Sequence, residues 1–363
     1  MVLKRWARSG RVEPLRHGDP LVTVGVTTHN EGSRLARCLD SVVGQSLPAQ
    51  QVEVIVVDDG SADGTHARAQ SYAERADWAG FSVLRHRRTG TAAKGRNMIL
   101  DQARGRYVFL VDGDDYLGPQ ALEATTAAAD KRRADVVVGK YHGVNRPAPN
   151  IRDPRNPKGR VKPGEYHSGW LNSLHIQKLF RTEFVRGLPY RFNEQLVYCN
   201  DHPFMVAVFL HAGTVARVDD VECYFITLEA DAPGHRGHVS RAEISAVAQL
   251  QFLHDVFGNL ALARGQGGDV AALASRMRVH YWNRFLKNQL PALLLRKTDP
   301  QAVTELARQA RYMTQLYGAQ ASQAGLVDEA SAMLQALNTE DAESVRSAAA
   351  QVRETARRRA AES

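Results

Sequence analysis

The chain has 363 residues, 44% of them hydrophobic, and a formal net charge of +8. This length allows two domains, and the composition is ordinary for a globular protein. No apolar run approaches the roughly 18 residues of a membrane span. The three cysteines (Cys38, Cys199 and Cys223) are far apart, which argues against a disulfide framework and a zinc site. The positive charge favours polyanionic partners or an anionic membrane surface.

The first twenty residues, Met1–Pro20, are basic and lack the apolar centre of a signal peptide, so we expect a mobile arm. Together with the cysteine pattern, this predicts a cytoplasmic protein. Its basic charge is compatible with peripheral association at the inner face of a membrane. Nothing in the sequence predicts a nucleic-acid partner.

Leu21–Thr28 is a continuous β-branched run and predicts the first buried strand. Further apolar runs predict strands at Val52–Val57, Phe81–Leu84, Tyr107–Val111, Asp135–Gly139, Val215–Val218 and Cys223–Thr227. Helical spacing or composition predicts intervening helices, among them Ala62–Ala79, Met98–Ala103, Ser168–Phe184 and a segment ending at His211. Strands that alternate with helices predict an α/β fold with a parallel, right-handed sheet.

Three predicted strands end in polar clusters: His29-Asn30, Asp58-Asp59 and Asp112-Gly113-Asp114-Asp115. Ligands of open α/β sheets bind beyond the carboxyl ends of the strands. Crowded carboxylates stay ionised together only near a positive partner, and oxygen-only ligands indicate Mg²⁺ or Mn²⁺. The alternative is a set of polar turns that cap the following helices. The repetition at three strand ends favours a binding site.

Other candidates have similar alternatives. Asp59 could accept a hydrogen bond from a uracil N3–H, and Lys94 and Arg96 suit phosphate oxygens. Asp201 could be a general base or simply the start of a helix. His235, Arg236 and His238 could close over a diphosphate or form a polar hinge. The glycine motifs of dinucleotide-binding and P-loop proteins are absent.

The remaining segments are less informative. Arg146–Gly164 carries five prolines and predicts a long loop, disordered or a lid. From Arg241 onward the sequence is alanine-rich with helical periodicity. Apolar residues of Thr339–Ser363 are too sparse for a core of their own, which predicts a frayed helix or one packed on a partner chain.

These motifs resemble those of inverting glycosyltransferases of family 2 with the GT-A fold. The resemblance rests on Thr27-Thr28-His29-Asn30-Glu31, Val56-Val57-Asp58-Asp59-Gly60-Ser61 and Val111-Asp112-Gly113-Asp114-Asp115. Within the family, the chain is most similar to wall teichoic acid glycosyltransferases that decorate poly-ribitol-phosphate. That similarity rests on Gly95-Arg96-Asn97, Gly143-Val144-Asn145, Lys178-Leu179-Phe180-Arg181, Asp201 and His238-Val239-Ser240.

The resemblance implies a GT-A fold, mostly parallel and Rossmann-like, over residues 21–240, preceded by the arm at 1–20. It implies a helical C-terminal region at 241–363 that forms a homo-oligomer. Asp201 would be the catalytic base, Asp114 would hold Mn²⁺ or Mg²⁺, and Arg236, His238 and Ser240 would contact the diphosphate. The nucleotide would be bound by Thr27, His29, Asn30, Asp59, Lys94, Arg96, Asn97, Asp112 and Gly113.

Two positions depart from the family pattern: His29 stands where Tyr is usual, and Asn200 stands where Glu usually precedes the base. The resemblance implies transfer of a sugar from a UDP-sugar to a hydroxyl group of an acceptor. It suggests N-acetylglucosamine as the sugar and an anionic polyol-phosphate polymer as the acceptor. A small natural product or another surface glycan is the alternative acceptor. The rival classes are a nucleotidyltransferase and a catalytically silent carbohydrate-binding module.

Overall fold

The computed structural model describes residues 18–148, 171, 173–228, 244–339 and 341–361. Its strands are β1 Val22–Thr28, β2 Val52–Asp58, β3 Gly80–Arg85, β4 Tyr107–Asp112, β5 Tyr116–Leu117, β6 Val136–Val144, β7 Leu179–Arg181 and β8 Val215–Thr227. The helices of its first part are α1 Ser33–Val43, α2 Thr65–Gln70, α3 Ala93–Gln102, α4 Ala121–Arg132, α5 Thr182–Arg186 and α6 Asp201–His211. Those of the second part are α7 Ala246–Leu250, α8 Phe252–Gly265, α9 Gly268–Arg284, α10 Leu290–Arg296, α11 Pro300–Leu316, α12 Asp328–Leu337 and α13 Ala342–Ala361.

The strands form one sheet in the order β3-β2-β1-β4-β7-β6-β8-β5. β1 to β4 pair in parallel, joined by crossover connections, and the β-branched and aromatic residues of β1, β2 and β4 are buried on both faces, whereas the edge strand β3 is only partly buried. The short strands β7 and β5 pair with their neighbours antiparallel. The sheet is therefore mixed, and the expectation of a parallel sheet is correct only for part of it.

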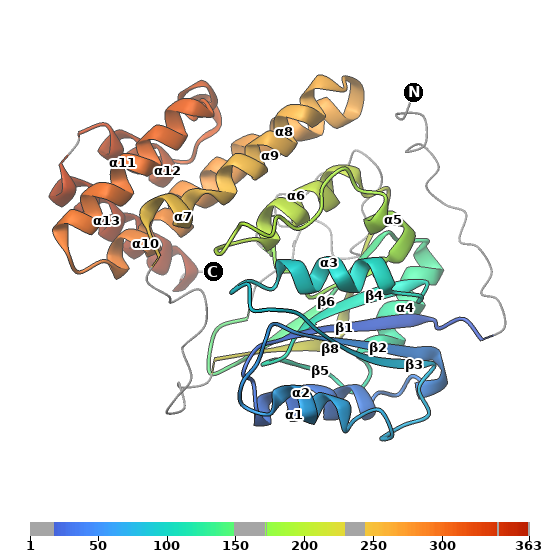
Figure 1. Cartoon of the computed structure of the whole chain (residues 1–363). Coiled ribbons are helices and arrows are strands. Elements are labelled where there is room, and N and C mark those ends of the chain that lie inside the picture. The colour runs from blue at the N-terminus through green and yellow to red at the C-terminus, as the bar shows by residue number, and fades with distance from the viewer. Residues whose placement is uncertain (1–17, 149–170, 172, 229–243, 340, 362–363) are drawn as a thin grey trace.

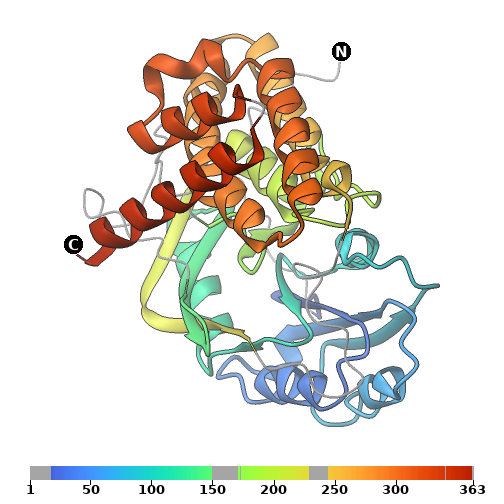
Figure 2. The ribbon, with the colours of Figure 1, turned by 90° about the vertical axis from the view of Figure 1, so that its left-hand side faces the viewer.

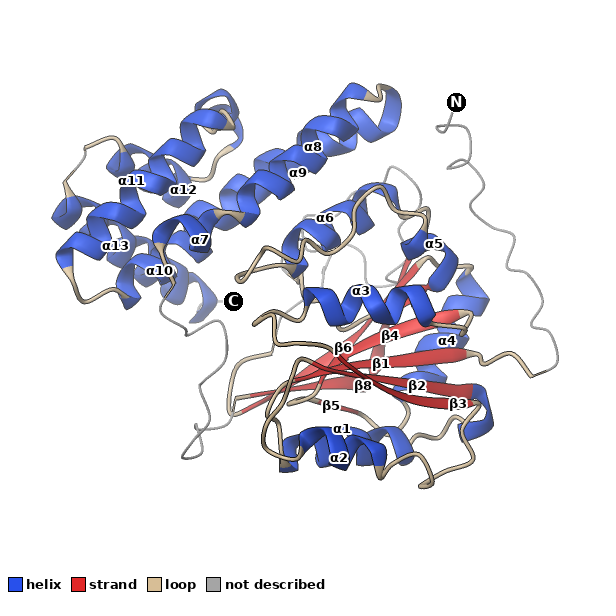
Figure 3. Cartoon of the chain, in the orientation of Figure 1, coloured by secondary structure: helices blue, strands red, loops and turns tan. Residues whose placement is uncertain are grey.

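Helices cover both faces of the sheet. Figure 1 shows α1 and α2 on one face and α3, α5 and α6 on the other, and Figure 3 shows the same layers by secondary structure. The helices from α7 to α13 follow as a separate layer beyond α6. Figure 2 looks toward the carboxyl ends of β1, β2 and β4, with this helical layer above the sheet.

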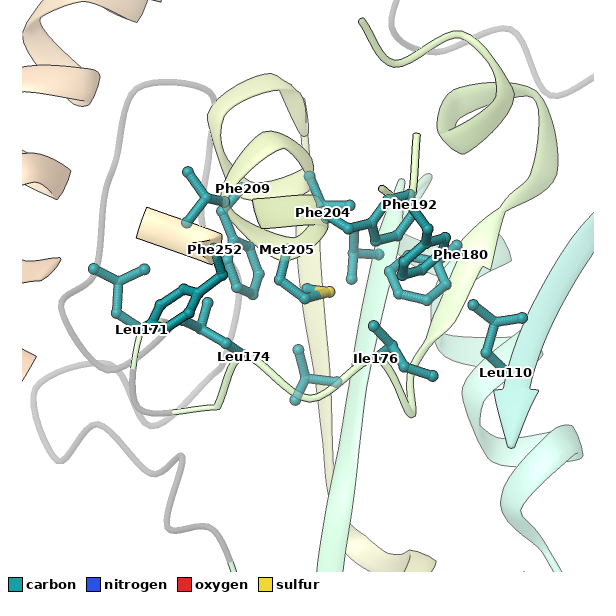
Figure 4. Packing of buried hydrophobic residues seen from close by; sticks show 14 of the residues in the cluster. Leu110, Leu171, Leu174, Ile176, Phe180, Phe192, Phe204, Met205, Phe209 and Phe252 are labelled. Atoms are coloured by element: carbon teal, nitrogen blue, oxygen red, sulfur yellow. The ribbon is translucent and has the colours of Figure 1, made fainter. Parts of the chain in front are cut away.

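The second part of the chain is fixed to the first through α6. Phe252 of α8 is fully buried beside Phe209 of α6, as Figure 4 shows, and its ring meets the His202 ring edge-on with centroids 5.5 Å apart. His202 Nδ1 and the Tyr281 hydroxyl of α9 are hydrogen-bonded at 2.8 Å. Within the described residues, no helix is long and apolar enough to cross a membrane.

The structure corrects several predicted elements. The described part of Ser168–Phe184 is not a helix: residues 173–178 have no regular structure, β7 follows, and only α5 at its end is helical. The two late strands are one strand, β8, and Ala62–Ala79 contains only the short helix α2. The helix expected from Met98 begins at Ala93. The strand expected at Asp135–Gly139 is β6, which begins at Val136 and continues to Val144.

The C-terminal helix was expected to fray or to need a partner chain, and this was wrong. α13 packs on α10 and α12 of its own chain. Val345, Ala349 and Val352 are buried there, at spacings of four and three residues that place them on one helical face. Small side chains are enough to form this buried face because α10 and α12 pack against it.

Candidate active site

The three polar clusters lie at one edge of the sheet, as predicted. In the parallel register, Thr28 is opposite Asp58, and Thr27 is opposite Asp112. Strands paired in this register end at the same height, so the residues that follow them are neighbours. The predicted convergence of these clusters at the carboxyl edge of the sheet is therefore confirmed, and their role as a binding site stays a prediction.

Asp112, the last residue of β4, is held by three side chains. Arg96 Nη2 donates to its Oδ1 at 3.0 Å, Gln177 Nε2 donates to its Oδ2 at 2.6 Å, and Thr27 Oγ1 donates to Oδ1 at 3.5 Å. Gln177 reaches this site because β7 is antiparallel to β4, so the chain entering β7 passes the carboxyl end of β4. The sequence analysis did not identify Gln177.

Arg96 lies on the buried side of α3 and joins two parts of the site. Its Nη2 contacts Asp112, and its Nη1 donates to Asn200 Oδ1 at 2.6 Å. Asn200 in turn donates through Nδ2 to Thr91 Oγ1 at 2.7 Å. One guanidinium group therefore ties the end of β4 to the residue before Asp201. Asn200 occupies the place where the resemblance would put Glu, and it offers Arg96 a neutral acceptor.

We expect Asn200→Ala to weaken donor binding about tenfold, since a hydrogen bond to a charged group is worth about 1.5–3 kcal/mol. The change would leave Arg96, which is 6% exposed, with one partner fewer. Calorimetry with UDP would measure the loss. Asn338→Ala, at the exposed end of α12, is the matched control. Unaltered UDP affinity in Asn200→Ala would show that Arg96 needs no support from Asn200.

Asp201 is the first residue of α6 and partly buried. Cys199, with a positive φ of 51°, turns the chain just before it. Burial raises the pKa of Asp201, the Arg96 guanidinium opposes this shift, Asp112 adds to it, and Lys178 opposes it. A carboxylate in the first turn of a helix is also favoured by the helix dipole. Asp201 is therefore a carboxylate with an elevated pKa at the same edge as Asp112.

Asp58 and Asp59 have different surroundings. Asp58 is fully buried and accepts hydrogen bonds from the backbone N–H of Ser61, at 2.9 Å, and from its hydroxyl. It shapes the turn after β2. Asp59 is close to the edge, and its Oδ1 and Oδ2 accept from the backbone N–H groups of Thr89, at 2.6 Å, and Gly90, at 3.0 Å. Its carboxylate fixes the loop before α3.

His29 is held in one orientation at the end of β1. Its Nδ1 lies 2.8 Å from the Asp59 carbonyl oxygen, and its Nε2 lies 3.1 Å from Asn30 Nδ2. The carbonyl can only accept and the amide nitrogen can only donate, so the proton of a neutral His29 belongs on Nδ1. Asn30 Oδ1 accepts from the Ala62 N–H at 2.8 Å, which sets the orientation of the amide.

The turn Asp112-Gly113-Asp114-Asp115 is clamped by neighbouring strands. Gly113 N–H donates to the Thr27 carbonyl at 2.9 Å. A Cβ on Gly113 would lie 3.0 Å from the Thr28 Cβ, so only glycine fits this approach without displacement. The Asp114 carbonyl accepts from Arg37 Nη2 and Thr227 Oγ1, both at 2.8 Å. Because the backbone is held from both sides, Asp114 has a defined position next to Asp112.

Negative charge is concentrated around this turn. Burial and then the charge of Asp114 raise the pKa of Glu31 to about 8, although Arg34 lies 2.8 Å away and opposes the shift. Burial, followed by Asp114 and Asp112, raises the pKa of Asp115 well above its ordinary value. Asp115 is satisfied by the Thr227 N–H at 2.7 Å and the Tyr224 hydroxyl at 2.8 Å. Carboxylates crowded in this way favour a cation between them.

The side chains of this edge fit a hard divalent ion in part. Among the described residues, no three His, Cys, Asp or Glu side chains are grouped to hold a metal ion alone. Mg²⁺ at phosphate sites is usually bound by one or two carboxylates, with phosphate oxygens and water completing the shell. Asp112 is bonded by Arg96 and Gln177, and Asp114 lies two residues further along the same turn, so this turn presents more than one carboxylate oxygen at the edge.

Of the remaining predicted site residues, some lie at the carboxyl edge and others do not. Thr27 contacts Asp112 as described. Lys94 lies in the first turn of α3, and not in a flexible loop, because that helix begins at Ala93. Asn97 is turned away from the edge: its Nδ2 donates to the Phe192 carbonyl at 2.9 Å, and its Oδ1 accepts from the Phe192 N–H at 3.1 Å. Arg236, His238 and Ser240, and the loop at 149–164, lie outside the described residues.

With the fold and the edge defined, comparison with known proteins gives the class. Residues 23–196 match the model of Glycosyl transferase family 2. This segment is therefore similar to family 2 glycosyltransferase domains, and the sheet with its flanking helices has a GT-A-like fold. This confirms the family resemblance seen in the motifs.

Two of the curated relatives are poly(ribitol-phosphate) glycosyltransferases. The poly(ribitol-phosphate) beta-N-acetylglucosaminyltransferase TarS of Staphylococcus aureus (strain Mu50) is 28% identical over 233 residues, which are 63% of this chain and 39% of TarS. TarP of Staphylococcus aureus (strain N315), of the same printed activity, is 24% identical over 215 residues, 59% of this chain and 65% of TarP. The chain thus spans about two fifths of the length of TarS.

The fold has a close counterpart among solved structures. Residues 1–349 of S. aureus TarS, in complex with UDP-GlcNAc, superpose with a TM-score of 0.78 over 92% of each chain, at 22% identity. The overlap extends past the sheet and includes most of the helical part. At this level of identity the likeness concerns the fold alone.

Proposed function

We propose that this protein is a metal-dependent inverting glycosyltransferase that transfers N-acetylglucosamine from UDP to a hydroxyl group of a polyol-phosphate chain. The observation that carries the proposal is the arrangement at the carboxyl edge. Asp59 follows β2 and Asp114 follows β4, the two strands that flank β1, and Arg96 bonds both Asp112 at the end of β4 and Asn200, the residue before Asp201. The names and bound ligand of TarS support the choice of donor and acceptor.

Different residues of the chain would contact the base, the ribose and the diphosphate of the donor. Asp59 would accept the uracil N3–H, and the fixed ring of His29 would lie against the base, less effectively than a tyrosine. Asp112 would contact the ribose. Asp114 would hold Mn²⁺ or Mg²⁺, which neutralises charge developing on the diphosphate when bound. Lys94 and the segment with Arg236, His238 and Ser240 would add positive charge there.

Asp201 would accept the proton of the acceptor hydroxyl. A base placed on the face opposite the leaving group inverts the anomeric carbon, by the same in-line geometry that separates inverting from retaining glycosidases. Asp201 meets one requirement of this role, because burial raises its pKa above the ordinary value and makes it a better proton acceptor once it is ionised.

An anionic acceptor is consistent with the charge of the helical part. Besides the net charge of +8, a cavity of about 640 Å³ between α10 and α13 is lined by Arg296, Arg353 and Arg357, with Glu354 as its acidic member. Glu354 itself pairs with Arg358. The end of α13 lies on the side of the molecule toward which the carboxyl ends of the strands point (Figure 2). We infer that this surface attracts phosphate groups of a long acceptor.

For the double substitution Arg353→Glu and Arg357→Glu, we expect the KM for poly(ribitol phosphate) to rise about tenfold at low salt, since two positive contacts become repulsive. The kcat and the KM for the UDP-sugar would stay near those of the wild type. Raising the salt concentration should reduce the difference in the KM for the polymer between the double variant and the wild type. The control is Arg308→Glu, because Arg308 already pairs with Glu305 on α11. If the double variant and the wild type had the same KM for the polymer, α13 would have no role in acceptor binding.

The experiment that tests the proposed function is a panel of UDP-sugars with poly(ribitol phosphate), assayed for UDP release with Mn²⁺ and with EDTA. UDP release with UDP-GlcNAc, dependent on the metal ion and on the polymer, is the expected result. Pyrophosphate as product would identify a nucleotidyltransferase. UDP release that requires a small-molecule acceptor would retain the reaction and change the acceptor. No turnover with any UDP-sugar would favour a silent binding module.

A further inference from the structure

The turn that carries Asp201 contains a strained residue, Cys199. In the part of the chain that the structure describes, four residues other than glycine have a positive φ: Asn30, Arg133, Asn145 and Cys199. Asparagine tolerates this left-handed conformation, and Arg133 ends α4, where the conformation is common. Cys199, with a φ of 51°, has neither reason. Such a residue keeps this backbone conformation only where its surroundings hold it.

The strain lies at an important position, because Cys199 is two residues before Asp201. The His202 N–H donates to the Cys199 carbonyl at 3.1 Å, so the conformation of Cys199 affects the chain on both sides of Asp201. A relaxed Cys199 would change the direction in which the chain enters α6 and would move the Asp201 carboxylate. A displacement of about 1 Å can cost about 10²-fold in rate. The contacts that hold Cys199 therefore also determine where Asp201 lies.

Two residues of the helical part contact this turn. Gln289 Nε2 donates to Cys199 Sγ at 3.1 Å, and the Tyr281 hydroxyl is hydrogen-bonded to His202 Nδ1 at 2.8 Å. Tyr281 is fully buried, and its ring meets the His202 ring edge-on with centroids 6.1 Å apart. Because Cys199 precedes Asp201 and His202 follows it, the helical part holds the turn on both sides of this carboxylate.

A π-helical turn brings these two side chains to one face of the helix. The π-helical segment is Phe285–Gln289, between α9 and α10. Tyr281 and Gln289 are eight residues apart. In a continuous α-helix that spacing is about 2.2 turns, which would place them about 80° apart around the axis. A π-helix takes more residues for each turn, so this segment removes most of the offset, and such turns are frequent at functional sites.

Packing alone does not account for an amide at position 289. Its Nε2 bonds the thiol, and its Oε1 is shielded from solvent with no hydrogen-bond partner among the described residues. A methionine would fill the same space without leaving a buried acceptor unpaired. Burial raises the pKa of the Cys199 thiol, and the charge of Asp201 adds to this shift, so Gln289 contacts a neutral thiol and not a reactive thiolate.

We propose that Gln289 and Tyr281 are positioning residues of the transfer reaction, which hold the turn at Cys199 and His202 and thereby set the position of Asp201. This rests on the proposed role of Asp201 as the base. Neither residue touches donor or acceptor in this scheme. The helical part then contributes to the rate of transfer through the turn, in addition to any contact with the acceptor.

The test begins with Gln289→Met, which removes the donor to Cys199 and keeps the length of the side chain. We expect kcat to fall about tenfold, with the KM for the UDP-sugar and the affinity for UDP within about twofold of wild type, because only the base is displaced. Tyr281→Phe, which keeps the buried ring, should have the same effect. Gln309→Met is the matched control: it removes a hydrogen bond to Glu305 on α11, and its kcat should stay at the wild-type value.

A second substitution distinguishes positioning from a packing defect. Glycine adopts a positive φ without strain, so Cys199→Gly in the Gln289→Met background should return kcat to within about threefold of wild type. Poor packing between the helical part and α6 would not be repaired by the loss of a further side chain. A double variant as slow as Gln289→Met would overturn the proposal. So would a parallel loss of kcat and UDP affinity in Gln289→Met.

A further measurement needs no substrate. Hydrogen exchange at the His202 amide, which donates to the Cys199 carbonyl, should be about tenfold faster in Gln289→Met than in wild type, and slow again in the double variant. Unchanged exchange in Gln289→Met would overturn the inference even if no UDP-sugar is a substrate. Faster exchange with an unchanged kcat would instead contradict the role of Asp201 as the base, so the two failures are distinguishable.

Discussion

Asp201→Asn should abolish most sugar transfer while leaving the donor site intact. The amide has the size of the carboxylate but cannot accept a proton, and a positioned general base contributes about 10²–10⁴-fold to the rate. We therefore expect kcat to fall by about three orders of magnitude, with the affinity for UDP within about twofold of wild type. Rates of UDP release with and without acceptor, together with UDP calorimetry, measure the two quantities.

The pH dependence gives an independent check on the same residue. Because burial raises the pKa of Asp201, the wild-type rate should decline as the pH falls through that raised value, where the base becomes protonated. The residual rate of Asp201→Asn should lack this decline. Asp220→Asn, an exposed position on β8, is the matched control and should keep the wild-type profile. If Asp201→Asn transfers sugar at the wild-type rate, the base lies elsewhere.

The carboxyl edge could be predicted because its signals are local. Each of the runs ending at Thr28, Val57 and Val111 is apolar and β-branched, and each is followed at once by polar residues. Parallel pairing then aligns the ends without further information. The glycine at 113 and the acids around it are likewise readable from a few neighbouring residues, and the structure places them at the aligned edge.

The partners of these residues could not be predicted, because they come from far along the chain. Gln177 meets Asp112 only because β7 enters the sheet antiparallel to β4, and that segment was expected to be helical. Asn200 contacts Arg96 across a separation of more than a hundred residues. Neither contact has a periodic or compositional signal. Asn97 likewise bonds Phe192, which is 95 residues away in the sequence.

The C-terminal helix illustrates a signal that was present but weak. Val345, Ala349 and Val352 lie on one buried helical face, and that face packs against α10 and α12. Because the apolar residues of this segment are sparse, the sequence pattern alone predicts no core of its own there. The pattern of one small apolar face fits packing on helices of the same chain as well as packing on a second chain. The sequence therefore does not determine which surface α13 contacts.

Asp114→Asn should abolish metal-assisted binding of the donor. The turn is held by Arg37 and Thr227 through the Asp114 carbonyl, so replacing the side chain leaves the backbone in place. Loss of one carboxylate also relieves the crowding that raises the pKa of Glu31 and Asp115, so the variant should fold at least as stably. We expect transfer to fall by at least about 10²-fold, in line with the charge stabilisation a bound metal ion supplies.

Calorimetry with UDP in Mn²⁺ and in EDTA distinguishes this effect from a general loss of the site. Wild type should bind UDP more tightly with Mn²⁺, and Asp114→Asn should bind equally in both conditions, at the affinity of wild type in EDTA. Asp77→Asn, an exposed residue just before β3 at the opposite edge of the sheet, should behave as wild type. If Asp114→Asn keeps the difference between Mn²⁺ and EDTA, the ion is bound without Asp114. The donor's negative charge would then have to be balanced by basic side chains such as Arg96 and Lys94.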